Sequence, residues 1–218
     1  MARRYATVLI ALAVCGVAHA DGPAGYRPRS NGPVAVSEQN AIDAYNQGYA
    51  SILRAEHQEN LAAAASTDAE RTAAKREARA AYEAALKHFE AAVRFDASMH
   101  EAYTYKGYAN RKLGRYEQAL AAYDQALRIN PDNPYAIEYQ GVAFLGLNRV
   151  DQARFNYLRL YALDTEQAHK LFVAMQAWLE QNRSKPPSGV DIAALEAWIA
   201  DRATTTERPM TNSAASSW

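Results

Sequence analysis

The segment His100–Asn133, HEAYTYKGYANRKLGRYEQALAAYDQALRINPDN, decides the fold because the chain repeats its pattern at once. The following segment, Pro134–Gln167, reads PYAIEYQGVAFLGLNRVDQARFNYLRLYALDTEQ. The shared positions, each one segment length apart, are Gly107 and Gly141, Ala119 and Ala153, and Tyr123 and Tyr157. Similarity at one fixed period is typical of proteins in which identical supersecondary units stack on one another.

Apolar residues recur at helical spacing on both sides of these two segments. The predicted helices are Ser37–Ala65, Asp68–Phe95, His100–Leu113, Tyr116–Ile129, Pro134–Leu147, Val150–Leu163, Glu166–Gln181 and Val190–Arg202. Gly114 and Asn148 stand where a left-handed residue ends a helix, and Thr67 with Glu70 forms a capping-box sequence that begins one. The sequence therefore predicts an all-α protein.

The repeat resembles the tetratricopeptide repeat, a family with the same 34-residue period. The matching positions are Tyr103, Gly107, Ala119, Tyr123, Ala126 and Pro131 in the first segment, and Ile137, Gly141, Phe144, Ala153 and Tyr157 in the second. Lys106, Asn110 and Thr165 depart from the family pattern. The resemblance implies an α-solenoid of about three helical hairpins, with capping helices after them.

An earlier copy of the pattern is visible in its second helix, where Tyr82 and Phe89 precede Tyr116 and Tyr123 by one full period. Its close-packing glycine is then Gly48, which makes the unit 41–99 about 25 residues longer than the family's repeat. Divided between two helices, this predicts a hairpin that extends about 18 Å beyond the others. The tip is predicted to be either a solvated Ala-rich extension or an arm that docks a partner.

The ends of the chain differ in composition from this helical region. Residues 1–20 have two arginines, an apolar stretch too short for a membrane span, and Ala18-His19-Ala20, so they predict a signal peptide cleaved before Asp21. Residues 21–37 are predicted to be a flexible leader and residues 204–218 a disordered tail. Between them, 38–203 forms the helical domain, with units 41–99, 100–133 and 134–167 and a partial or capping unit at 168–203.

This leader predicts a periplasmic or secreted protein. Val14 is too bulky for a lipobox, so we do not expect a lipoprotein anchored through Cys15. Cleavage removes Cys15, the single cysteine, and therefore excludes disulfides and thiol chemistry from the processed chain. No membrane span is expected after the leader is removed.

Charge and motifs exclude several classes of function. The chain has 24 Lys and Arg against 24 Asp and Glu, which argues against a nucleic-acid partner. No P-loop, Gly-x-Ser-x-Gly elbow or helical pair of histidines is present. We therefore expect no enzymatic activity, no cofactor and no metal.

In the tetratricopeptide family the first helix of each hairpin lines a concave face that meets peptides. By position, the lining here would be Tyr45 and Tyr49 from the first unit, Thr104, Tyr105, Tyr108, Arg111 and Lys112 from the second, and Tyr135, Glu138, Tyr139, Val142 and Leu145 from the third. The Lys/Asn set with which some members bind a C-terminal carboxylate is not matched. Six of the twelve are tyrosines, which suit interaction surfaces; the alternative is that half of these tyrosines pack between helices.

The predicted function is that of an exported interaction module or scaffold, which binds a peptide segment or protein partner through its concave face. Two alternatives stay open: a non-catalytic accessory subunit, and a self-associating structural protein of a cell-envelope complex. Homo-oligomers belong to the second alternative. The sequence does not identify the partner.

Overall fold

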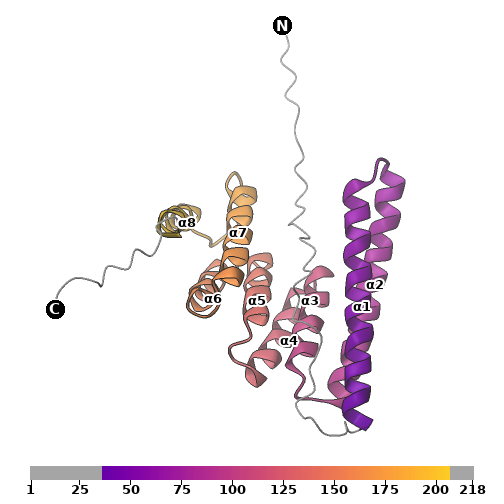
Figure 1. Ribbon diagram of the computed structural model, residues 1–218. Helices are drawn as coiled ribbons and strands as arrows, with labels where there is room; N and C mark the ends of the chain where they lie inside the picture. Colours follow the sequence, from indigo (N-terminus) through magenta and orange to yellow (C-terminus); the bar gives the residue numbers. More distant parts are fainter. Residues whose placement is uncertain (1–35, 207–218) are drawn as a thin grey trace, which may run out of the picture.

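The computed structural model describes residues 36–206, and this part of the chain is helical, with no strand. Figure 1 shows the order of the helices. They are α1 (Val36–Ala64), α2 (Asp68–Phe95), α3 (His100–Lys112), α4 (Tyr116–Ile129), α5 (Pro134–Gly146), α6 (Val150–Leu163), α7 (Thr165–Asn182) and α8 (Ile192–Thr206). The all-α prediction is confirmed, and within 36–206 no helix is long and apolar enough to cross a membrane.

Most helix ends lie where local sequence signals place them. The Thr67 side chain accepts a hydrogen bond from the Glu70 backbone, and the Glu70 carboxylate accepts one from the Thr67 backbone at 3.1 Å. Gly114 and Asn148 have φ of 76° and 59°, as left-handed residues at helix ends do.

The last helix differs from the prediction, because α8 begins at Ile192 and continues to Thr206, inside the predicted tail. The chain has no Gly or Pro between Gly189 and Pro209 to end it earlier, and the Thr204 hydroxyl donates to the Asp201 carbonyl. The predicted signal peptide, most of the leader and residues 207–218 lie outside the described residues.

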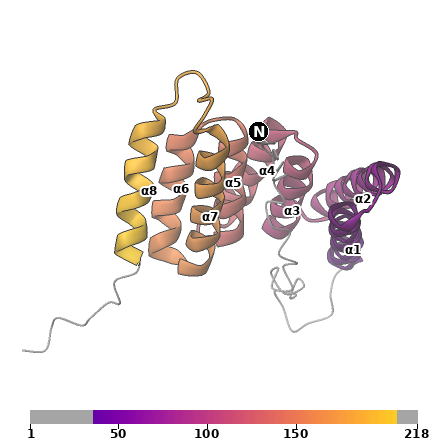
Figure 2. The same ribbon diagram turned by 90° about the horizontal axis from the view of Figure 1, so that it is seen from above.

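The helices pair as consecutive hairpins, α1 with α2, α3 with α4, and α5 with α6. The first hairpin is the longest, and in Figure 1 its indigo and purple helices extend as an arm beyond α3 and α4. Figure 2 shows the hairpins following one another from this arm to α8. This is the α-solenoid architecture that the 34-residue period predicts.

A glycine lets the two helices of a hairpin approach closely. A Cβ atom at Gly48 would lie 2.7 Å from Cε1 of Phe89, and one at Gly107 would overlap the Tyr123 ring. The two contacts are equivalent, so Gly48 is the close-packing glycine of the enlarged first unit. Gly141 differs, because a Cβ atom there would meet Leu171 of α7 at 2.5 Å.

One ion pair recurs between successive hairpins. Arg115 pairs with Glu83 at 2.5 Å, and one period later Arg149 pairs with Glu117 at 2.7 Å. In each pair the arginine precedes the second helix of its own hairpin, and the glutamate belongs to the second helix of the hairpin before. The repeated pair therefore joins each hairpin to its predecessor in one register.

The C-terminal helix closes the far end of the stack. Leu195 and Ile199 of α8 are buried in a core cluster with residues of α6 and α7. The Trp198 ring lies 5.3 Å from the Tyr157 ring, nearly perpendicular to it, and the Arg154 guanidinium lies 5.1 Å from its centroid. Helix α8 thus covers apolar surface that α6 and α7 would otherwise expose.

We predict that Gly48→Val lowers the free energy of unfolding by ~2 kcal/mol, since the added side chain must displace the Phe89 ring. Ala50→Val is the matched control, because Ala50 is exposed on the same helix. It should cost about 0.5 kcal/mol of helix propensity. Urea denaturation followed by circular dichroism measures both variants, and equal stabilities would contradict the close packing.

Candidate functional site

The first helices of successive hairpins, α1, α3, α5 and α7, are neighbours in the stack. Residues at equivalent positions on these helices form what we call the inner face. Ten members are open or partly open: Tyr49, Tyr108, Arg111, Lys112, Tyr135, Val142, His169, Val173, Gln176 and Glu180. The inner face is the surface on which the predicted partner-binding residues were placed.

The structure divides the twelve predicted residues into two equal groups. Tyr49, Tyr108, Arg111, Lys112, Tyr135 and Val142 are half-buried, whereas Tyr45, Thr104, Tyr105, Glu138, Tyr139 and Leu145 are buried. Three of the six tyrosines thus pack between helices, as the alternative interpretation had it. Whether the half-buried residues contact a partner stays a prediction.

The buried tyrosines form an aromatic core and offer little surface to a partner. The Tyr105 ring lies 6.0 Å from that of Tyr45 and 5.8 Å from that of Phe89. Farther along the stack, the Tyr139 ring lies 5.1 Å from that of Tyr108. Burial raises the pKa of Tyr105 and of Tyr139 above the ordinary tyrosine value. Because these rings fill the space between first helices, the expectation that they form an open stripe is corrected.

Thr104 and Leu145 are buried and make contacts within the fold. The Thr104 hydroxyl donates to the His100 carbonyl at 2.8 Å and accepts from the Asn133 amide at 3.0 Å. Asn133 in turn caps the start of α5, since its side chain accepts from the backbone of Ala136. Leu145 packs in the C-terminal core cluster. Both residues lie behind the inner face.

Polar contacts attach the arm to the inner face of α3. The Tyr108 hydroxyl donates to Glu56 at 2.6 Å, and the Lys112 ammonium lies 2.5 Å from Glu59. The Arg111 guanidinium carbon lies 5.0 Å from the centroid of the Tyr108 ring, within the range of a cation–π contact. At this end of the stack, the partly open residues already have partners within the chain.

Helix α7 contributes open positions that the sequence prediction missed. Val173 and Gln176 lie one period after Tyr139 and Val142, and both are exposed. Val173 is 48% exposed, whereas Tyr139 is 2% exposed. The inner face opens here because no further first helix follows α7 within 36–206. Extending the period by one unit would have found these positions.

Glu138 is a buried carboxyl next to the inner face. Burial raises its pKa to about 7, although Arg111 and Lys170 act in the opposite direction. The group is therefore about half protonated at pH 7. Between the ordinary glutamate pKa and about pH 7, the Glu138 carboxyl is mainly protonated in the folded chain but mainly ionised in the unfolded chain.

We predict that this burial makes stability fall as the pH rises. An acid with a raised pKa contributes stability at low pH that is lost as the pH rises through its folded pKa. From pH 5 to pH 8, at about 1.4 kcal/mol per pKa unit, the loss should approach ~3 kcal/mol. In Glu138→Gln this contribution should vanish, so the variant gains stability relative to the wild type as the pH rises.

Urea denaturation at pH 5 and pH 8 measures the difference between variant and wild type. Glu77→Gln is the control, since the Glu77 side chain is 60% exposed. An equal difference at both pH values for Glu138→Gln would contradict the assigned environment.

Comparison with family models identifies a known repeat in the middle of the chain. Residues 100–133, which comprise α3, α4 and the turn after them, match the family described as "Tetratricopeptide repeat". No curated protein matches the chain. This repeat suggests a protein–protein interaction module, and its family is generally non-catalytic. The hairpin whose Gly107 packs on Tyr123 is thus the segment that is similar to a tetratricopeptide repeat, and it lies within an all-helical stack.

Proposed function

We propose that the chain is an exported, non-catalytic interaction module that binds a peptide segment of a protein partner across its inner face. The proposed contact is strongest at the α5–α7 end. There Tyr135 and Val142 are half-buried and Val173 is exposed. The match to a tetratricopeptide repeat supports a function in protein–protein binding.

The observation that carries this proposal is the change in burial along one set of equivalent positions. Tyr105 is 3% exposed and Tyr139 is 2% exposed, but Val173 is 48% exposed. At the α3 end the open side chains are engaged by the arm, whereas the four inner positions of α7 are exposed. A peptide would gain most by placing an apolar side chain against Val173 and Tyr135, because burial of apolar area drives such binding.

Export is proposed on the sequence of residues 1–20 alone. The basic start, the apolar stretch and the small residues Ala18 and Ala20 are the three features of a secretory signal peptide, and the small residues fit the signal peptidase. A periplasmic or extracellular location would follow.

We predict that peptides selected from a random display library on the processed chain lose at least tenfold in affinity when Val173→Glu and Tyr135→Ala are combined. The combined change removes the open apolar area and adds a buried charge under the peptide. Tyr105 and Tyr139 are unsuitable targets, because their removal would unfold the core.

Phe95→Glu is the matched control, since Phe95 of α2 is also 48% exposed. It should leave the affinity unchanged in fluorescence anisotropy titrations. If the control variant abolished binding and the inner-face variant did not, the peptide site would lie elsewhere.

For export, we predict that the chain recovered from expressing cells begins at Asp21, as N-terminal sequencing would show. Ala20→Arg should block processing, because the peptidase accepts only small residues there. Cys15→Ala should leave processing unchanged. A recovered chain that retains Met1 would contradict the proposal.

A further inference from the structure

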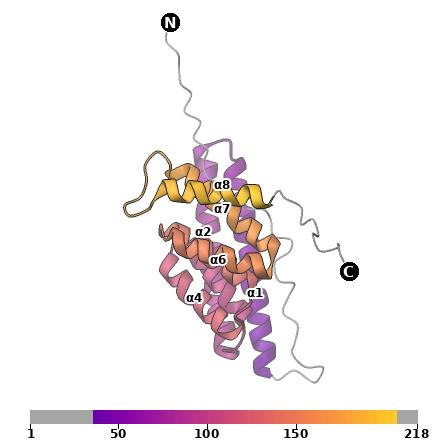
Figure 3. The ribbon, with the colours of Figure 1, turned by 90° about the vertical axis from the view of Figure 1, so that its left-hand side faces the viewer.

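Helix α6 carries an unusual share of exposed apolar surface. Of the nine large hydrophobic side chains that are exposed among the described residues, four lie on α6: Phe155, Leu158, Tyr161 and Leu163. Phe155 is the most exposed of the four, at 67%. Figure 3 shows α6 between α4 and α8, on the side of the stack where the second helices lie. This outer face is separate from the inner face.

Two charged side chains of α6 lie symmetrically about the exposed Phe155. Asp151 and Arg159 lie four residues before and four residues after it, so all three follow one ridge of the helix. At 1.5 Å per residue, each charge is about 6 Å from Phe155 along the helix axis. The Asp151 side chain is 91% exposed and that of Arg159 is 30% exposed. Within the chain they face Arg154 at 3.3 Å and Asp132 at 3.9 Å, respectively.

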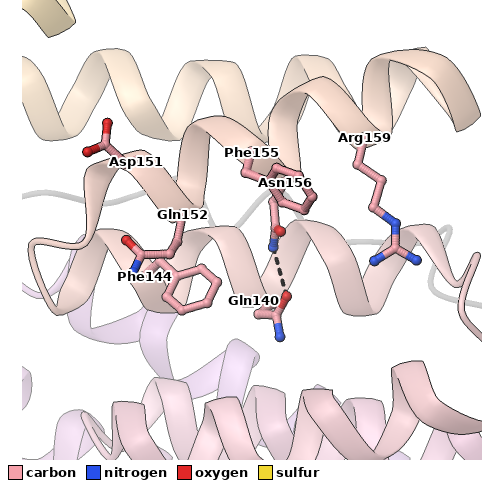
Figure 4. A pocket seen from close by; sticks show the side chains of 7 residues that line it. All are labelled: Gln140, Phe144, Asp151, Gln152, Phe155, Asn156 and Arg159. Carbon is pink, nitrogen blue, oxygen red and sulfur yellow. Dashed lines mark hydrogen bonds between the residues drawn. The ribbon is translucent and has the colours of Figure 1, made fainter.

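A groove of about 480 Å³ lies beside this ridge. Figure 4 shows the side chains that line it, which are Gln140, Phe144, Asp151, Gln152, Phe155, Asn156 and Arg159. The two buried amides hydrogen-bond each other, with Asn156 donating to Gln140 at 3.0 Å, and Gln140 donates to Asp124 at 2.7 Å. Because these amides already have partners, the groove offers a ligand chiefly the rings of Phe144 and Phe155.

We propose that the occupant of this outer face is a second copy of the chain, paired through α6 about a two-fold axis at Phe155. If the two α6 helices run antiparallel, residue 151 of each copy faces residue 159 of the other. Asp151 then meets Arg159 of the second copy, and this ion pair occurs twice. A two-fold interface requires such self-complementarity of one surface patch, and the sequence Asp151, Phe155, Arg159 supplies it.

The same pairing fills the groove. Residue 158 of one copy faces residue 152 of the other, so Leu158 enters between Gln152, Phe144 and Phe155 of its partner. Leu158 is 47% exposed in the single chain, and this contact would cover it. The interface goes beyond the proposed peptide binding, because it leaves both inner faces open. A dimer would present two peptide sites, which raises its avidity for a partner with two binding segments.

Sedimentation equilibrium of the processed chain across a concentration series tests the proposal. We expect a monomer–dimer equilibrium whose dissociation constant rises at least tenfold in Leu158→Glu. Leu53→Glu is the matched control, since Leu53 is also 47% exposed but lies on α1. Circular dichroism shows that each variant is folded. A chain that stays monomeric at all concentrations, or a dimer that Leu158→Glu does not weaken, overturns the proposal.

Charge reversal tests the antiparallel pairing itself. Asp151→Arg alone places two arginines opposite each other, and Arg159→Glu alone opposes two acidic groups, so each should weaken the dimer at least tenfold. The double variant Asp151→Arg/Arg159→Glu restores opposite charges and should regain most of the affinity. Recovery in the double variant would show that residues 151 and 159 face each other, because general damage to the surface is not repaired by a second substitution. Loss of the dimer in both single variants and also in the double variant would overturn the assigned pairing.

Discussion

The contact between a glycine of the first helix and an aromatic ring of the second sets the spacing of the first two hairpins. Gly107 meets Tyr123 in this way, and Gly48 meets Phe89. Neither position has room for a side chain unless the ring moves, so each ring packs directly on the backbone of the first helix and sets how closely the two helices lie. The first helices of neighbouring hairpins are then near enough for their own tyrosines to pack on one another. The aromatic core of the stack depends on this spacing.

Electrostatic contacts have a different role from this packing. The Arg115–Glu83 pair is more than a third exposed on both sides, and exposed pairs contribute little to stability. Its recurrence as Arg149–Glu117 instead fixes how each hairpin is placed on the one before. Glu138 is the opposite case, because its burial costs free energy when it is ionised. The chain thus keeps its orienting charges at the surface and one destabilising acid near the inner face.

Local signals in the sequence were sufficient to predict most of the helices and their ends. The capping box at Thr67, the left-handed Gly114 and the displaced glycine Gly48 were all read from residue type and spacing, and the structure has each of them. These features depend on contacts with at most one neighbouring helix, which a repeat period already specifies. The length of α8 was underestimated because polar threonines resemble a tail until their hydrogen bonds are seen.

Burial along the inner face could not be predicted in the same way. A tyrosine suits both a core and an open surface, so residue type alone does not distinguish Tyr105 from Tyr135. What distinguishes them is the proximity of the next first helix, and this depends on the glycine contacts. The 34-residue period gives the positions on α7, but the exposure of Val173 follows from the end of the series, which is visible only once α8 is placed against α6 and α7. The contact of Gly141 also depends on the next unit, because a Cβ atom there would meet Leu171 of α7.

The close stacking of the hairpins is tested most directly by hydroxyl-radical footprinting of the folded chain, in which mass spectrometry gives the oxidation rate of each tyrosine. Tyr161, which is 42% exposed, serves as the internal standard. If glycine spacing draws the first helices together, Tyr45, Tyr105 and Tyr139 should be oxidised only as fast as the chain unfolds, and Tyr49 and Tyr135 should react measurably faster. Oxidation of Tyr105 and Tyr139 at the rate of Tyr161 would show that the hairpins do not stack closely, and would contradict the account.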